Sequence, residues 1–315
     1  KISSILNCHE SEIVFTSGGT ESNNMVLKSI LKRGDHLITS SYEHPAILKV
    51  AKNLESKGVL VTYIDPTIEG KINPEDVRKA IQQNTKLISI MYANNEIGSI
   101  NPIKEIANIC NDNNILFHSD AVQCIGKIPI DLSNQKIDFI SIAAHKFYGP
   151  KSIGILYISR KNNIDPLFIG GGQEKGIRPG TENISLIAGM SLALEIATNN
   201  MEENISHISR MEKTLEEELN KNNINYKING KNRLPGLLNI SFHNIEGQTL
   251  LMNLDMAGIA ISYGSACSSG SSKPSDVLIK IGIDEKIAQN SVRISIGKFI
   301  KKDDILNLVD NIKMV

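Results

Sequence analysis

The chain has 315 residues, of which 41% are hydrophobic and 22% charged, and this length is sufficient for two ordinary domains. It carries 34 basic and 34 acidic residues, which excludes the basic excess typical of proteins that bind nucleic acids or membrane surfaces. A small-molecule substrate is therefore expected. No membrane-spanning run or signal peptide is visible, and four scattered cysteines favour a reducing, cytoplasmic location.

The first half of the chain alternates short β-branched runs with longer helical patterns. The predicted strands are residues 13–16, 36–40, 59–64, 86–92, 115–119, 139–142 and 153–158. The predicted helices are residues 21–31, 46–56, 74–83 and 102–112. Strands that are apolar on both faces and separated by helices predict an α/β fold with a mostly parallel sheet covered on both sides.

The second half has a different pattern. A long helical stretch over residues 184–219 carries a charged face, and strands follow near residues 237–241, 259–262 and 291–296 before a final helix from residue 302. We therefore expect a large domain over residues 1–198 and a smaller α+β domain over residues 199–315, hinged on the long helix.

Ligands of parallel sheets bind beyond the carboxyl ends of the strands, so the residues that follow each predicted strand are the candidates for chemistry. The first strand leads through Gly18, Gly19 and Thr20 into a helix, and glycines at a helix N-terminus favour a bound anion such as phosphate. The structural alternative is a simple capped turn, with Thr20 or Ser22 as the N-cap.

Two charged residues follow neighbouring strands. Asp120, with Gln123 close behind, could pair with a protonated pyridine nitrogen, or it could simply cap a helix or form a surface ion pair. Lys146 stands among apolar and aromatic neighbours, where loss of solvent favours a nucleophilic amine, although a solvated surface lysine is the ordinary alternative. Together these residues indicate pyridoxal-phosphate chemistry.

Three further positions are candidates. Asn95 and His44 each follow another predicted strand, and His44 could serve only to begin a helix at Pro45. Cys267 lies in a Ser/Gly-rich loop and is either a reactive thiol or an incidental exposed one. Cys110, in an apolar helical pattern, is expected to be buried and inert. No metal ligands are predicted.

Five segments, taken in order, resemble the cysteine desulfurases of the class V aminotransferase group, which are fold-type I pyridoxal-phosphate enzymes. They are Thr-Ser-Gly-Gly-Thr-Glu-Ser-Asn-Asn at 16–24, Asn-Asn-Glu-Ile-Gly at 94–98, His-Lys-Phe-Tyr-Gly-Pro-Lys at 145–151, Arg-Pro-Gly-Thr-Glu-Asn at 178–183 and Gly-Ser-Ala-Cys-Ser-Ser-Gly at 264–270. The resemblance covers nearly the whole chain.

The resemblance implies a role for each matching residue. Lys146 would attach the cofactor, Asp120 would pair with its ring nitrogen, Gln123 would bind its phenolic oxygen, and His44 would stack on its ring and help to move protons. The phosphate would be held by Gly19, Thr20 and His145, and by Thr181 from the other subunit of a homodimer. Asn95 would contact the cofactor and, with Arg293, the substrate carboxylate.

The implied reaction converts L-cysteine to L-alanine and leaves the sulfur on Cys267 as a persulfide, for an unidentified protein acceptor such as an iron–sulfur scaffold. Ala143 stands where relatives carry a phosphate-binding serine, and Ser152 replaces a common glycine. Relatives also carry a further segment upstream of Lys1. The alternatives are a class V aminotransferase or selenocysteine lyase, which would not need Cys267, and a non-catalytic sulfur-assembly scaffold or inactive fragment.

Overall fold

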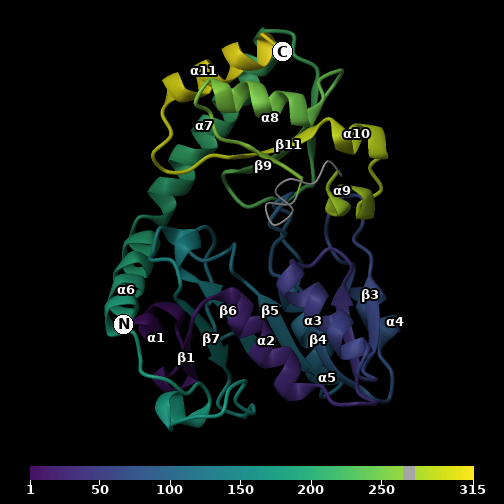
Figure 1. Ribbon diagram of the computed structural model, residues 1–315, viewed down its shortest axis with the longest axis vertical. Coiled ribbons are helices and arrows are strands. Elements are labelled where there is room, and N and C mark those ends of the chain that lie inside the picture. The colour runs from purple at the N-terminus through teal and green to yellow at the C-terminus, as the bar shows by residue number, and fades with distance from the viewer. Residues whose placement is uncertain (265–273) are drawn as a thin grey trace. The chain divides into compact units, whose positions relative to one another are not determined.

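In the computed structural model, which describes residues 1–264 and 274–315, the first half of the chain forms one sheet of seven strands in the order β1-β7-β6-β5-β4-β2-β3 (Figure 1). The strands are β1 (Ile13–Thr16), β2 (His36–Ser40), β3 (Leu60–Ile64), β4 (Thr85–Ser89), β5 (Leu116–Asp120), β6 (Phe139–Ala143) and β7 (Gly154–Ile158). All seven predicted strands of this half are present, and the predicted α/β fold is confirmed.

Strand direction brings the candidate residues to one edge of this sheet. Strands β3, β2, β4, β5 and β6 are parallel, whereas β7 is antiparallel to both β6 and β1. Because β1 and β6 both oppose β7, they run in the same direction. The carboxyl ends of β1, β2, β5 and β6 therefore meet at one edge, where parallel sheets bind their ligands.

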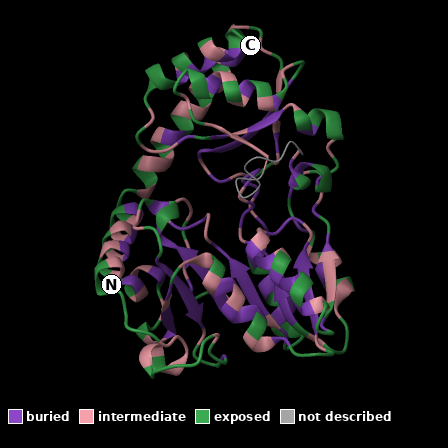
Figure 2. Cartoon of the chain, viewed as in Figure 1, coloured by how far each residue is buried: buried purple, intermediate pink, exposed green. Residues whose placement is uncertain are grey.

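Helices cover the apolar faces of this sheet, whose strands are largely buried (Figure 2). The helices of this half are α1 (Ile2–Leu6), α2 (Gly19–Ile30), α3 (Pro45–Glu55), α4 (Pro74–Ala80), α5 (Ile103–Asp112) and α6 (Ile184–Asn199). Helices α2 and α3 contact each other, and their apolar residues share one core with Leu37, Leu87, Phe139 and Leu156 of the sheet. Short 3-10 turns η1 (Glu10–Glu12), η2 (Ala144–Phe147) and η3 (Gln173–Gly176) complete this part.

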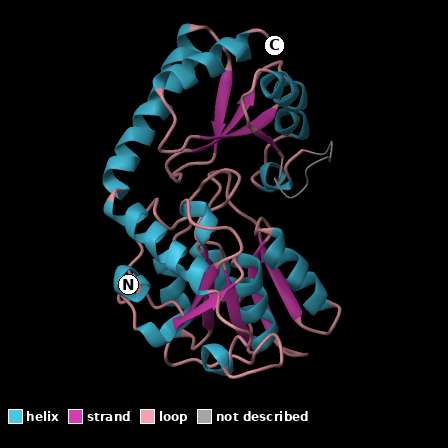
Figure 3. Ribbon diagram, turned by 60° about the vertical axis from the view of Figure 1, so that its left-hand side comes forward, coloured by secondary structure: helices cyan, strands magenta, loops and turns pink. Residues whose placement is uncertain are grey.

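The second half forms a four-stranded antiparallel sheet in the order β10-β11-β9-β8 (Figure 3). Its elements are α7 (Met201–Lys221), β8 (Tyr226–Asn229), β9 (Leu237–Phe242), α8 (Gly247–Met256), β10 (Ser262–Tyr263), α9 (Asp276–Lys280), α10 (Glu285–Gln289), β11 (Ser291–Ser295) and α11 (Lys302–Lys313). Apolar side chains of α7, α8 and α11 share a core with β9 and β11.

The chain divides into two compact units that are not continuous in sequence. The first comprises residues 1–65, 72–93 and 101–201, and the second comprises residues 66–71, 94–100 and 202–315. Two short segments from the first half of the sequence thus belong to the second unit. The division into domains over residues 1–198 and 199–315 stays a prediction.

The second half departs from the sequence pattern in three places. The single predicted helix over 184–219 is two helices, because Asn200 leaves the helical conformation between α6 and α7. The strand predicted at 259–262 begins only at Ser262, and strand β8 and helices α8, α9 and α10 were not predicted. None of the helices in the described part of the chain is long and apolar enough to cross a membrane.

Candidate active site

The N-terminus of α2 lies at the carboxyl end of β1, where glycines let a ligand approach the backbone closely. Gly18 is the N-cap with φ of 144°, and no side chain of the described residues caps the helix there. A Cβ on Gly19 would come within 2.6 Å of the Val122 side chain, so only glycine fits beside the turn that follows β5. The first N–H groups of a helix have no partner within it, and α2 therefore offers donors for an anion at this edge.

Asp120 ends β5 as a buried carboxylate. Its Oδ2 accepts a hydrogen bond from Asn23 Nδ2 at 2.7 Å, and its Oδ1 accepts one from the Val122 N–H at 3.0 Å. Burial raises the pKa of Asp120, while the charges of His44 and Lys146 oppose that rise. A buried carboxylate at a ligand-binding edge is suited to a cationic partner.

His44 begins helix α3 and lies near the same carboxylate. Its Nδ1 accepts a hydrogen bond from the Ala46 N–H at 3.1 Å, so the neutral ring carries its proton on Nε2. Burial lowers the pKa of His44, the charge of Asp120 raises it, and the charge of Lys146 lowers it further. His44 is therefore a neutral imidazole that lies within electrostatic reach of both groups.

Lys146 and His145 lie in η2, the turn that follows β6. The turn closes with Tyr148 at φ of 65°, and a Cβ on Gly149 would meet Ala144 at 2.9 Å, so the Tyr-Gly pair allows this tight return. Burial and the nearby charge of Lys146 lower the pKa of His145. The first unit thus places Lys146, Asp120 and His44 after the carboxyl ends of three strands at one edge of the sheet.

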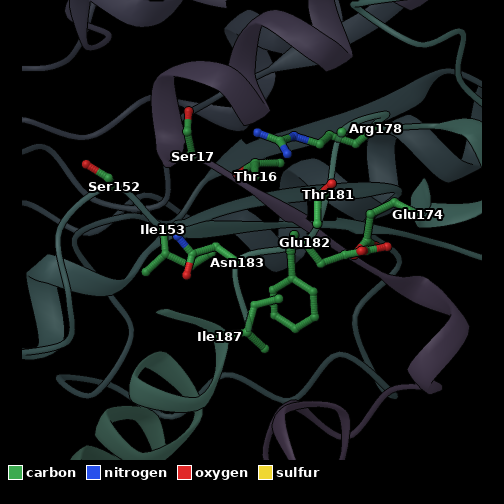
Figure 4. A pocket seen from close by; sticks show the side chains of 12 residues that line it. Thr16, Ser17, Ser152, Ile153, Glu174, Arg178, Thr181, Glu182, Asn183 and Ile187 are labelled. Atoms are coloured by element: carbon green, nitrogen blue, oxygen red, sulfur yellow. The ribbon is translucent and has the colours of Figure 1, made fainter. Parts of the chain in front are cut away.

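The structure places two more of the predicted residues. Thr181 is exposed and lines a cavity of about 240 Å³ together with Thr16, Ser17 and Ser152 (Figure 4). Gln123 is half-buried in the turn after β5. Cys267 lies outside the residues that the structure describes.

An ion pair fixes one wall of the Thr181 cavity. Arg178 Nε donates to Glu21 Oε1 at 2.9 Å, which ties the segment before Thr181 to the first turn of α2. Burial raises the pKa of Glu21, but the bonds from Arg178 and Ser17 outweigh it and the net pKa is lowered. The departure at Ser152 has a visible consequence here, because Ser152 has φ of 61°, a conformation that favours glycine.

Asn95 and Arg293, the predicted substrate-binding pair, both belong to the second unit. Arg293 is on β11, and its Nη1 donates to the Asn95 carbonyl oxygen at 3.0 Å. Its Nη2 donates to Ser262 Oγ on β10 at 3.1 Å. The structure therefore brings these two residues together, and their binding of a substrate carboxylate stays a prediction.

Two buried polar residues of the first unit escaped the sequence analysis. Asn23 holds Asp120, and its place one helical turn after Gly19 was the available signal. Glu43 is 3% exposed, and its Oε1 accepts hydrogen bonds from Ser40 Oγ at 2.6 Å and from the Met91 N–H at 2.8 Å. Its Oε2 is buried and has no hydrogen-bond partner. The pattern around Glu43 gave no sign of burial, because a carboxylate beside a helix start is usually solvated.

Glu43 predicts a pH dependence of stability. Burial, with a further contribution from the charge of Asp120, raises its pKa from 4.5 to about 8. Between these values the folded protein keeps a proton that the unfolded chain has released, so stability falls as pH rises. We expect Glu43→Gln to remove this loss and to gain on the order of a few kcal/mol relative to the wild type by pH 8. Thermal unfolding at several pH values measures the difference.

The matched control is Glu75→Gln on α4, an exposed carboxylate whose replacement should leave the pH slope unchanged. Equal pH slopes for the wild type and Glu43→Gln would show that Glu43 is ionised in the folded protein.

A family model described as aminotransferase class-V matches residues 1–308. The chain belongs to this family. Members of the class-V aminotransferase family bind pyridoxal phosphate, which confirms the predicted cofactor.

Curated relatives and solved structures agree on the nearer relationship. "Cysteine desulfurase IscS" of Dictyoglomus turgidum is 42% identical to this chain and is aligned over 100% of it and 82% of the relative. The protein of the same name from Clostridium botulinum is 46% identical over 97% of this chain and 79% of its own. A solved structure titled "NIFS-LIKE PROTEIN" superposes with a TM-score of 0.92 at 37% identity, covering 99% of this chain and 84% of that one.

Proposed function

We propose that this class-V family member is a pyridoxal-phosphate-dependent cysteine desulfurase that converts L-cysteine to L-alanine and transfers the sulfur to Cys267. The observation that carries the proposal is the convergence of Lys146, Asp120 and His44 at the carboxyl ends of strands β6, β5 and β2. The similarity to cysteine desulfurases over nearly the whole chain supports the substrate.

The residues at this edge fit the cofactor. Helix α2 presents free N–H groups beside Gly19 for a phosphate, and the buried carboxylate of Asp120 suits a protonated ring nitrogen. Lys146 is the amine within electrostatic reach of Asp120. When bound, pyridoxal phosphate supplies an electron sink for the bonds of the substrate α-carbon.

The proposed roles follow from what each side chain can do. Asp120, held by Asn23, would keep a proton on the ring nitrogen, and His44, whose Nδ1 is engaged by Ala46, would stack on the ring and help to move protons. Lys146 attaches the cofactor and moves the proton of the substrate α-carbon. Gly19, Thr20 and His145 bind the phosphate. Gln123 binds the phenolic oxygen.

The transfer of sulfur from L-cysteine to Cys267 needs no added oxidant or reductant. The thiolate of Cys267 attacks the sulfur of the substrate, an S–S bond forms, and the bond between that sulfur and the substrate β-carbon breaks. The electron pair of the broken bond takes a proton at the β-carbon. The products are L-alanine and a persulfide on Cys267. Arg293 and Asn95 bind the substrate carboxylate, for which a guanidinium is well shaped.

A product assay tests the proposal. Purified protein loaded with pyridoxal phosphate is incubated with L-cysteine, and alanine is measured together with persulfide on Cys267 by mass spectrometry. One alanine per persulfide in the first turnover is expected. A protein that instead transfers the amino group of L-cysteine to a 2-oxo acid, without a persulfide, would be an aminotransferase.

Asp120 has a quantitative prediction of its own. Asp120→Asn keeps the shape and one acceptor oxygen, which can take the bond from Asn23 or from Val122, but removes the charge that holds the ring proton. Because a hydrogen bond to a charged group contributes about 1.5–3 kcal/mol, activity should fall by roughly ten- to a hundredfold. Steady-state alanine production with saturating cofactor measures this. Asp112→Asn, the same change at an exposed carboxylate at the end of α5, is the control and should leave activity near that of the wild type.

We further propose that the enzyme is a homodimer in which Thr181 binds the phosphate of the partner's cofactor. Ile184, Leu192 and Ile196 of α6 are 76%, 54% and 41% exposed and repeat at helical spacing on a face that begins three residues after Thr181. Phe168 and Ile169, on the preceding loop, are exposed as well. Exposed apolar side chains at these positions support a protein interface.

The oligomeric state checks this interface. The wild type should elute at twice the 34.6 kDa chain mass, and the double change Leu192→Glu with Ile196→Glu should yield monomers that bind the cofactor more weakly. Light scattering coupled to gel filtration measures the mass. Ile68→Glu, also an exposed isoleucine, should stay dimeric. A monomeric wild type that keeps full activity would contradict the role of Thr181.

The persulfide is proposed to pass to a protein acceptor for the synthesis of iron–sulfur clusters or other sulfur-containing cofactors. A reducing compartment such as the cytoplasm suits this chemistry, because the thiol of Cys267 must be free before each turnover.

A further inference from the structure

The Asn-Asn-Glu-Ile-Gly turn is built rigidly into the second unit. The Oδ1 of Asn94 accepts a hydrogen bond from the Glu96 N–H at 2.8 Å, which closes the turn on itself. The carbonyl oxygen of Gly98 accepts one from the Leu234 N–H at 2.9 Å, which ties the turn to the segment before β9. Residues 94–100 therefore hold the two polar residues at their centre, Asn95 and Glu96, in fixed places.

Asn95 holds one flank of residues 265–273, the segment that contains Cys267. Arg293 donates to the Asn95 carbonyl oxygen and, through its other terminal nitrogen, to Ser262 Oγ. Ser262 is on β10, directly opposite Arg293 in the antiparallel pairing, and lies three residues before position 265. The guanidinium proposed to bind the substrate carboxylate thus also secures the chain just before this segment.

Glu96 holds the other flank. It is 5% exposed, and its Oε2 accepts a hydrogen bond from Ser275 Oγ at 2.5 Å. Ser275 is itself 3% exposed and is the N-cap of α9, where its Oγ also accepts from the Leu278 N–H. It lies two residues after position 273. Adjacent residues of one turn therefore secure the chain on both sides of residues 265–273.

The carboxylate of Glu96 is not explained by packing. Burial raises its pKa, Ser275 and the charge of Arg293 lower it, and the charge of Asp276 raises it. A buried carboxylate costs free energy that an apolar side chain of similar size would not, so a role in packing alone would be filled more cheaply by such a residue. Its hydrogen-bond partner Ser275 follows the Cys267 segment, and the adjacent Asn95 carbonyl accepts from Arg293, which is proposed to bind substrate, so these contacts indicate where Glu96 acts.

We propose that Glu96 is a positioning residue for sulfur transfer. It fixes the flank of the Cys267 segment through its bond to Ser275, and its charge tunes the hold of Arg293 on the substrate carboxylate. This inference rests on the proposed desulfurase function. Glu96 would have two separate effects. Its bond to Ser275 governs the rate of sulfur transfer, and its charge near Arg293 governs substrate binding.

Three variants separate these effects in the cofactor-loaded enzyme. Ser275→Ala removes the bond and keeps the charge, so kcat for alanine should fall by roughly tenfold or more with little change in KM for L-cysteine. Glu96→Gln keeps an acceptor for Ser275 but removes a negative charge that repels the substrate carboxylate, so KM should fall while kcat stays within about twofold. Glu96→Ala loses both, and adding Ser275→Ala to it should lower kcat no further.

Loss of the helix cap is controlled by Ser275→Asp. Aspartate caps a helix as well as serine does but repels Glu96, so kcat should still fall, and combining it with Glu96→Gln should restore kcat. Glu69→Ala removes an exposed carboxylate of the same unit, paired with Lys71 and Lys231, and should change neither constant. The visible absorption of the cofactor should be the same in all variants.

The outcomes distinguish the inference from the function on which it rests. A wild type that forms alanine and persulfide, with Ser275→Ala and Glu96→Ala both within about twofold of its kcat, overturns the positioning role alone. A wild type that forms no persulfide overturns the desulfurase function and the inference with it. If Glu96→Ala does not fold, Ser275→Asp with and without Glu96→Gln decides the matter through the same rescue of kcat.

Discussion

Lys146→Ala is expected to yield a colourless protein without desulfurase activity. The lysine is in the turn after β6, within electrostatic reach of Asp120 and His44. Removing its amine removes both the attachment of the cofactor and the base for the substrate α-proton. Loss of a catalytic group of this kind costs roughly a thousandfold or more in rate. The absorption spectrum and alanine production from L-cysteine measure the two losses separately.

The control for Lys146→Ala is Lys151→Ala, five residues along the same motif. Lys151 is exposed and influences His145 only by its charge. This variant should keep the colour and most of the activity. A Lys146→Ala protein that stays coloured after extensive dialysis and denaturation would show that another amine holds the cofactor.

Cys267→Ala is expected to abolish persulfide formation while the enzyme keeps its cofactor. Alanine production should fall by at least about a thousandfold, because without a thiolate acceptor the substrate sulfur has no nucleophile to receive it. The visible spectrum should still respond to L-cysteine, since the substrate can bind at Lys146, Arg293 and Asn95. Single-turnover alanine formation and mass spectrometry of the intact protein test both parts.

The other cysteines provide the matched control for Cys267. Cys110 and Cys124 are buried, and burial raises the pKa of each thiol well above its ordinary range, which keeps both inert. Cys8 is half-buried, and burial with the charge of Glu12 raises its pKa to about 11. Cys8→Ala should therefore retain full persulfide formation. Persistent alanine production by Cys267→Ala would favour an aminotransferase or lyase without a protein sulfur acceptor.

The sheet of the first unit could be predicted from sequence because its signals are local. Apolar β-branched runs such as residues 36–40 alternate with helices that begin at Pro45 and Pro74, and these patterns need no knowledge of distant contacts. The antiparallel direction of β7 could not be predicted, because the short connection from β6 through η2 folds back only as Tyr148 and Gly149 allow. Strand direction depends on the turn as well as on the strand.

The second unit was harder to predict from sequence, because its strands are short and the apolar periodicity of its helices is weak. Strand β8 contains only four residues, of which one has a fully buried side chain. The apolar pattern of α8 does not mark one buried face, because Met252 and Met256 are exposed. The pair Asn199-Asn200 was the available signal for the break, since asparagine favours helix ends over helix interiors.

The residues of the candidate site also divide into those that could be predicted from sequence and those that could not. Strand-end placement was enough to select Lys146, Asp120 and His44. It could not select Glu43 and Glu96, because the burial of a carboxylate depends on partners such as Met91 and Ser275 that are distant in sequence. Such residues are found only when the hydrogen bonds of every buried polar atom are traced.

The discontinuity of the second unit has a consequence for the order in which the protein is made. Residues 66–71 and 94–100 leave the ribosome long before the strands β9 and β11 with which they share a unit. During synthesis, Asn95 and Glu96 cannot form their hydrogen bonds with Arg293 and Ser275 until those residues, near the other end of the chain, have been made. The contacts that Asn95 and Glu96 make with Arg293 and Ser275 can therefore form only when translation is nearly finished. A gene fragment that encodes residues 202–315 alone would lack the turn that secures it.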